Sequence, residues 1–278
     1  NKDMHVIRKE KLKNIDEIKE IRVKNLYYKY HNDDDYVLKN INMTIRVGES
    51  FAILGRNGSG KTTLAKVIMG FYDDYEGKIY INGIDLKEID KTSYMERVGT
   101  LFQEFSKYEA TLRENISYGN LDIIDNDNYL VNIGSKFKIQ ELIDNGYKGL
   151  DMQLGYWFDD GKQISIGQWQ KIALSRAFAK KADIYILDEP NAALDAISEY
   201  DLSIMYKDLF ANKIGLIIAH RFNNFIKQVD KIIVIEDGNI VESGTHIELI
   251  KKRGLYSKLY NLQIGEYEED IIEMATDS

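Results

Sequence analysis

Eight residues from Gly55 to Thr62, Gly-Arg-Asn-Gly-Ser-Gly-Lys-Thr, have the spacing of a glycine-rich phosphate-binding loop. Phosphate oxygens bind to a ring of backbone N–H groups at a helix N-terminus, and glycines let the backbone wrap closely enough to form it. Lys61 is expected to reach the β- and γ-phosphates of a nucleotide, and the Thr62 hydroxyl to ligate Mg²⁺. An apolar segment, 51–54, precedes the loop, and an amphipathic segment, 64–68, follows it. This context predicts a P-loop between a strand and a helix. The residues expected to contact the nucleotide are Gly55, Arg56, Asn57, Gly58, Ser59, Gly60, Lys61, Thr62 and Thr63.

Two adjacent acids, Asp188 and Glu189, follow the apolar run 184–187. At the end of a buried strand, Asp188 is expected to hold Mg²⁺ through water, and Glu189 to orient and deprotonate the attacking water. Pro190, the single proline of the chain, follows at once and ends the strand where the acids must be presented. Four apolar residues before two acids form a common pattern, which becomes specific here because it accompanies a P-loop.

Composition restricts the class of protein. The 278 residues include 44% hydrophobic side chains, which excludes a disordered or fibrous chain. The net charge of −8 argues against nucleic acid as a partner, because phosphate backbones bind basic surfaces. Without cysteine there is no disulfide scaffold, thiol catalysis or thiolate metal site. No apolar run approaches the roughly 18–20 residues of a membrane-spanning helix. We therefore expect a soluble, globular, intracellular chain.

Strand-like and helical segments alternate along the chain, which indicates an α/β fold with a parallel core sheet. Residues 104–170 are expected to be mainly helical, and residues 32–35 form a turn. The expected strands are 20–23, 26–28, 41–47, 50–54, 184–187, 214–218, 232–235 and 240–241.

Five further motifs accompany the P-loop and the two acids in a fixed order. They are Tyr30 at the end of Asn-Leu-Tyr-Tyr-Lys-Tyr, Gln103 in Val-Gly-Thr-Leu-Phe-Gln, Ile164-Ser-Ile-Gly-Gln168, Ala193-Leu-Asp195, and His220 in Ile-Ile-Ala-His-Arg. Together these motifs resemble the ATP-binding-cassette (ABC) family of ATPases over residues 20–260. The resemblance implies a P-loop NTPase core, an N-terminal antiparallel β portion and an inserted α-helical subdomain. It also implies ATP as substrate and Mg²⁺ as cofactor.

The resemblance also implies a role for each motif. Glu189, His220 and Gln103 are the expected catalytic residues, and Thr62, Gln103 and Asp188 are the expected Mg²⁺ ligands. Tyr30 is expected to stack on adenine, with Tyr28 as the alternative, although an aromatic residue in a strand often belongs to the core. Ser165, Gly167 and Gln168 of the signature motif and Asp195 of the D-loop are expected to contact ATP. The remaining histidines, His5, His31 and His246, are interpreted as surface residues.

The signature motif departs from the family's usual Leu-Ser-Gly-Gly-Gln, since Ile166 replaces the first glycine. A β-branched residue disfavours a positive φ and adds bulk at this position. Because Ser165 and Gly167 are kept, we expect both sites to close and hydrolyse ATP. A serine that only caps a helix is the alternative.

Charged residues indicate a linker or leader, or a solvated helix, at 1–19 and an acidic tail at 265–278. The resemblance covers the ATPase domain between them (20–264), with its helical subdomain at about 104–170. The first residue is Asn1 and the first methionine is Met4, which suggests a fragment, with a trimmed terminus as the alternative.

Family members work as pairs that sandwich two nucleotides, so the expected partners are a second copy and a transmembrane domain, fused N-terminally. This implies a position at the cytoplasmic face of a bacterial membrane. The segment 154–161, with Asp159, resembles the loop by which exporters contact the opposite transmembrane subunit, and 241–246 and 254–260 resemble fused exporters. The segments 102–108 and 167–171 resemble exporters of lantibiotic-type peptides, which favours peptide export.

Two alternatives remain: a stand-alone ATPase subunit of a multi-subunit transporter, and a soluble ABC ATPase without a transport role. The second class carries long insertions or a second cassette, whereas roughly 60 residues separate Gln103 from Ser165 here. No nucleic acid partner is expected.

Overall fold

The computed structural model describes residues 12–31, 33–144, 148–191, 194–219, 222 and 225–263. Several predictions lie outside these residues: His220, Ala193, His5, Asn32, most of the linker (1–11) and the acidic tail.

A six-stranded sheet forms the centre of the molecule, in the order β10-β9-β3-β8-β7-β6. Strands β3, β6, β7, β8 and β9 are parallel, and β10 pairs antiparallel with β9. The central strands β3, β7 and β8 are buried at every position, as expected of parallel strands with both faces covered. The strands are β3 Ser50–Leu54, β6 Val98–Leu101, β7 Ile184–Asp188, β8 Ile214–Ile218, β9 Lys231–Glu236 and β10 Asn239–Gly244.

A second sheet is antiparallel, in the order β2-β1-β4-β5. Its strands are β1 Glu20–Tyr28, β2 Leu38–Arg46, β4 Glu76–Ile81 and β5 Ile84–Asp85. The predicted N-terminal antiparallel portion is therefore confirmed, and the segments 20–23 and 26–28 belong to one strand. Sequence patterns missed β4, β5 and β6, because β4 begins with three exposed residues and the other two strands are very short.

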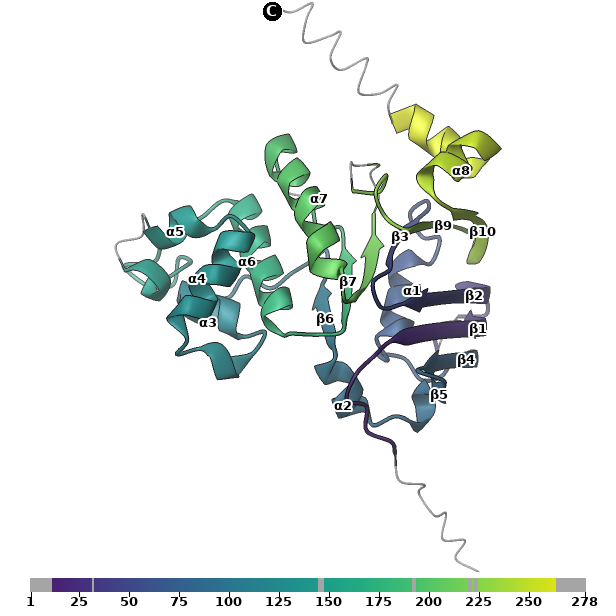
Figure 1. Cartoon of the computed structure of the whole chain (residues 1–278), viewed down its shortest axis with the longest axis horizontal. Coiled ribbons are helices and arrows are strands. Elements are labelled where there is room, and N and C mark those ends of the chain that lie inside the picture. The colour runs from purple at the N-terminus through teal and green to yellow at the C-terminus, as the bar shows by residue number, and fades with distance from the viewer. Residues whose placement is uncertain are drawn as a thin grey trace, which may run out of the picture.

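Helices cover both sides of the parallel sheet. In Figure 1 the helical region α3–α6 lies on one side of this sheet and the antiparallel sheet lies on the other. The predicted helical subdomain is present, although its first helix starts at Leu112 and not at 104. The α-helices are α1 Lys61–Ile68, α2 Lys91–Glu96, α3 Leu112–Ser117, α4 Asp127–Lys136, α5 Gln140–Asp144, α6 Ile166–Ala179, α7 Ala196–Phe210 and α8 His246–Lys252. Short 3₁₀ turns occur at η1 Leu86–Glu88, η2 Leu121–Ile123 and η3 Gly149–Asp151. Among the helices described, none is both long and apolar enough to cross a bilayer.

Two hydrophobic clusters hold these layers together. One lies between the antiparallel sheet, α1 and one face of the parallel sheet, and contains Leu26, Ile53 and Leu64. The other joins the opposite face to the helical region, where the rings of Phe178 and Tyr185 stack with centroids 4.1 Å apart. The parallel sheet is therefore supported on both faces, which keeps the ends of its strands in fixed relative positions.

His246, interpreted from the sequence as a surface residue, is half-buried. Its Nδ1 lies 2.7 Å from the Tyr256 hydroxyl, and its ring packs edge-on against Tyr260. The surface prediction was wrong because the chain after α8 returns to cover this histidine.

We expect His246 to make stability depend on pH. Burial and then the Lys227 charge hold the pKa of His246 below its ordinary value of 6.5. The unfolded chain therefore binds more protons between the folded pKa and about 6.5, so the free energy of unfolding rises with pH through that window. Urea unfolding at about pH 5.5 and about pH 7.5 measures this slope, and His246→Gln is expected to reduce it. An equal slope in both proteins would contradict the prediction.

Candidate active site

The predicted P-loop joins the end of β3 to the start of α1, as expected. Gly60 is the residue before the helix and has φ of 106°, a conformation that disfavours any side chain. A Cβ built on Gly60 would also lie 2.9 Å from the Val37 carbonyl oxygen. The tight approach of this loop to the start of β2 therefore requires glycine.

Lys61 is buried and lies across its own loop. Its Nζ donates hydrogen bonds to the carbonyl oxygens of Gly55 at 2.8 Å and Arg56 at 2.9 Å. Burial lowers the pKa of the Lys61 ammonium, whereas the Asp188 and Glu189 carboxylates raise it. The loop thus holds a partly desolvated ammonium group, whose attraction for a phosphate oxygen is stronger here than in water.

The P-loop meets the end of β7. The Thr62 hydroxyl donates a 3.0 Å hydrogen bond to Oδ2 of Asp188, a residue 126 positions later in the chain. Asp188 is 4% exposed. A hydroxyl and a buried carboxylate side by side are the oxygen donors that Mg²⁺ prefers.

Glu189 lies just beyond the strand in an unusual backbone conformation, with φ of 49°. Its N–H donates to the Ile218 carbonyl at 3.0 Å, and its own carbonyl accepts a 3.1 Å hydrogen bond from the buried Gln170 amide. The Gln103 amide donates to Oε2 of Glu189 at 3.1 Å. The structure therefore brings together Gln103 and Glu189, two residues for which the family resemblance implies catalytic roles.

Lys61, Thr62, Gln103 and Glu189 line one groove of about 670 Å³. Tyr30 lies on its wall, and the Tyr30 hydroxyl is 2.9 Å from the Thr63 Oγ1. Asp33 and Val37 also line it and were not predicted, because nothing in their local sequence distinguishes them from other turn and strand residues. The predicted residues that line the groove are Tyr30, Asn57, Gly58, Gly60, Lys61, Thr62, Thr63, Gln103 and Glu189.

The described signature and D-loop residues Ser165, Gly167, Gln168 and Asp195, in contrast, are absent from the lining of this groove. Ser165 and Gln168 cap the N-terminus of α6 reciprocally: the Gln168 N–H donates to the Ser165 Oγ, and the Ser165 N–H donates to the Gln168 Oε1. Asp195 caps α7 by accepting from the Ser198 N–H, which lowers the pKa of its carboxyl. Ile166 is the first residue of α6 and is 48% exposed.

With this geometry described, comparison with known proteins identifies the family. Residues 38–192, more than half of the chain, match the family described as ABC transporter. The chain belongs to the ABC transporter family. As a member of the ATP-binding part of this family, it binds and hydrolyses ATP, and the resemblance predicted from the motifs is confirmed.

Among similar ABC proteins are two that are named transport ATP-binding proteins. The chain is 44% identical to the subtilin transport ATP-binding protein SpaT of Bacillus subtilis over 88% of its own length. It is 40% identical to the nisin transport ATP-binding protein NisT of Lactococcus lactis subsp. lactis over 90% of its length. It covers 40% and 41% of these two relatives, respectively. The fold also matches the structure of a bacterial Atm1-family ABC exporter with ATP bound, with TM-score 0.83 and 27% identity, over 91% of this chain and 43% of that one.

Gln170 is a site-supporting residue that sequence reasoning missed. The feature of the sequence that could have indicated it is a polar residue on the apolar face of α6, the helix that begins within the signature motif. Gln170 is 2% exposed there. Its amide reaches the Glu189 carbonyl and so stabilises the positive φ that directs the Glu189 side chain toward Gln103.

We expect Gln170→Leu to lower the kcat of ATP hydrolysis about tenfold while changing KM less than about twofold, since the side chain supports Glu189 and does not line the groove. Gln140→Leu in α5, which replaces a glutamine of the helical region, is the matched control. Steady-state ATPase assays of both variants decide the matter, and equal kcat values for the two would contradict the assignment.

Proposed function

We propose that this chain is the ATPase domain of a bacterial exporter that works as a homodimer. The observation that carries the proposal is the separation within one chain of the P-loop groove from the signature serine. Ser165 and Gln168 sit at the start of α6, outside the groove that contains Lys61 and Glu189. If the groove residues and the signature residues contact the same ATP, a second copy of the chain must supply the signature residues.

Each residue of the proposed ATP site has a role that follows from its chemistry. The P-loop N–H groups and Lys61 bind the phosphates, and Tyr30 stacks on the base. Glu189 orients and deprotonates the attacking water as the general base, and Gln103 donates a hydrogen bond to the Glu189 carboxylate. We assign His220 a contact with the γ-phosphate, and Ser165, Gly167, Gln168 and Asp195 contacts with the ATP of the other copy.

Mg²⁺ is the proposed cofactor. Thr62 and Asp188 are already within hydrogen-bond distance of one another, and Gln103 lies beside Glu189 at the same end of the sheet. These oxygen donors fit a hard divalent cation, which would neutralise phosphate charge during hydrolysis.

The proposed cargo is a peptide, because SpaT and NisT carry the names of subtilin and nisin transport. The chain spans about 40% of the length of these relatives, which leaves room in such proteins for a transmembrane part. We propose a transmembrane partner fused N-terminally, and a position at the cytoplasmic face of the membrane. A separate transmembrane subunit is the alternative, and the full-length gene distinguishes the two.

The domain boundaries are part of the same proposal. We assign residues 1–19 to a linker, 20–264 to the ATPase domain and 265–278 to an acidic tail. The antiparallel pairing begins at Glu20, but Ile15 and Ile18 are already buried in the core of the ATPase domain, so the packed domain extends to the N-terminal side of this boundary.

The first test is the solution mass of Glu189→Gln with and without Mg-ATP. Loss of the general base is expected to trap ATP between two copies, because closure persists when hydrolysis is blocked. The mass should then rise from 32.2 kDa to about twice that value. Ser165→Ala in the same background is expected to remain monomeric at equal ATP. A monomer in Glu189→Gln that still binds ATP would contradict dimerisation by this chain alone.

Ile166 provides a second test of the same proposal. As the first helical residue of α6 it has no positive φ that would demand glycine. We therefore expect Ile166→Gly to change the ATPase rate by less than about tenfold. The change would come mainly from the lower helix propensity of glycine and from the smaller side chain at the proposed interface between the two copies. An inactive parent with an active Ile166→Gly variant would show that this isoleucine blocks closure.

A further inference from the structure

Tyr30 belongs to a cluster of three tyrosines beside the P-loop, with Tyr28 and Tyr72. The Tyr30 ring meets Tyr28 edge-to-face, with centroids 5.3 Å apart and an interplanar angle of 81°. It meets Tyr72 in the same way, at 5.8 Å and 90°. Tyr28 and Tyr72 stack on one another at 5.0 Å and 26°. Each ring therefore contacts both of the others.

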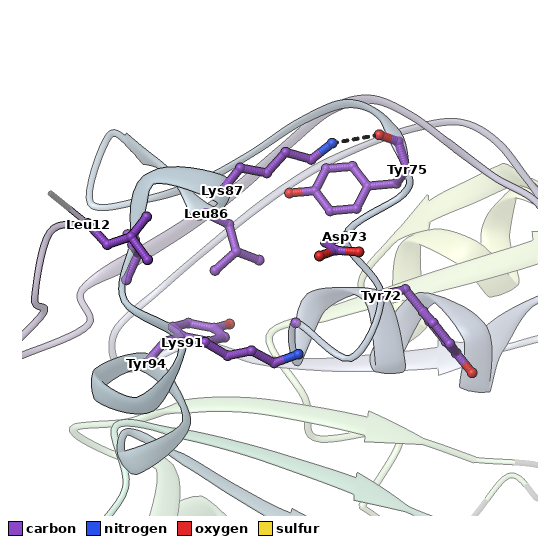
Figure 2. Close-up of a pocket in the computed structure, with 10 residues that line it drawn as sticks. Leu12, Tyr72, Asp73, Tyr75, Leu86, Lys87, Lys91 and Tyr94 are labelled. Atoms are coloured by element: carbon purple, nitrogen blue, oxygen red, sulfur yellow. Dashed lines mark hydrogen bonds between the residues drawn. The ribbon is translucent and has the colours of Figure 1, made fainter. Parts of the chain in front are cut away.

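The three tyrosines differ in what they face. Tyr30 lines the nucleotide groove, whereas Tyr28 and Tyr72 are absent from its lining. Tyr28 is buried at the end of β1, and burial followed by the Asp74 charge raises its pKa to about 12. Tyr72 is half-buried at the edge of a neighbouring cavity of about 320 Å³. Figure 2 shows the Tyr72 hydroxyl directed away from that cavity.

The position of Tyr30 depends on these neighbours, because it lies two residues beyond the end of β1 and outside the sheet ladder. Its ring has one edge contact to Tyr28, another to Tyr72, and a hydroxyl contact to Thr63. Perpendicular ring contacts are directional, so two of them at one ring restrict its rotation. Truncating Tyr72 would remove one restraint without removing any surface of the groove.

Helix α1 links this cluster to the phosphate site. Thr63 lies in its first turn, and Tyr72 lies in the loop that follows the helix, just after Gly70 with its φ of 77°. Tyr30 is therefore contacted both by the start of α1, which adjoins the P-loop, and by the loop that leaves the other end of the same helix. This arrangement sets the distance between the base-stacking ring and the phosphate-binding loop.

We propose that Tyr72 is a positioning residue for the nucleotide base: it holds the Tyr30 ring in the orientation that stacks on the base, and it does not touch the nucleotide itself. The inference rests on the proposed base-stacking role of Tyr30. It predicts that Tyr72 contributes to the binding of the base and makes no contribution to the binding of the phosphates.

The test compares two ligands by calorimetry, ATP and inorganic tripolyphosphate, which carries the same phosphate chain without a base. Tyr72→Ala is expected to weaken ATP binding about threefold to tenfold, a fraction of the full stacking effect, and to leave tripolyphosphate binding unchanged. Tyr72→Phe keeps both ring contacts and is expected to restore ATP binding to within about twofold. Tyr80→Ala, which replaces a half-buried tyrosine in β4, is the matched control and is expected to change the binding of neither ligand.

A double variant separates this inference from the role of Tyr30. In Tyr30→Ala, adding Tyr72→Ala is expected to cause no further loss of ATP affinity, because Tyr72 acts through Tyr30. Equal weakening of ATP and tripolyphosphate binding, or full additivity in the double variant, would overturn the inference. If Tyr30→Ala itself leaves ATP affinity unchanged, the stacking proposal fails. If Tyr72→Ala does not fold, Tyr72→Leu takes its place with the same expected results.

Discussion

The hydrogen bond between Thr62 and Asp188 joins the two halves of the active site, and the other site contacts depend on the pairing that makes it possible. Strand β8 lies between β3 and β7, so the P-loop that follows β3 and the acids that end β7 emerge at the same edge of the sheet. Side chains at that edge are brought together because parallel strands share a direction. A one-residue slip of β7 would turn Asp188 to the opposite face of the sheet.

Buried charge is the second constraint. Lys61 is 3% exposed, and the cost of burying an ammonium group is offset by two loop carbonyls and by the Asp188 and Glu189 carboxylates. The glycines of the loop are necessary to this arrangement, since they allow the carbonyls of Gly55 and Arg56 to approach the same Nζ. The conformational freedom of glycine thus permits a loop in which two carbonyl oxygens hold the Lys61 ammonium group.

Helix α6 connects the signature motif to the catalytic edge. Its N-terminus is capped by Ser165 and Gln168, and one turn further on Gln170 holds the Glu189 carbonyl. Both sets of contacts therefore belong to one continuous helix, Ile166–Ala179. Helix α6 therefore carries the signature residues that we assign to the ATP of a second copy. It also carries Gln170, which supports the general base Glu189 of its own site.

The sequence alone predicts the chemistry, because a contiguous loop of glycines with Lys61 and Thr62, and an apolar strand that ends in two acids, are local patterns with local physical causes. It also indicated the parallel core, because apolar runs alternate with helical segments. Other contacts between distant elements depend on the fold and could not be predicted, such as Gln170 with Glu189, Tyr72 with Tyr30, and His246 with Tyr256. Such contacts arise from the packing of elements remote in sequence, and neither residue of a pair carries a periodic or compositional signal that names its partner.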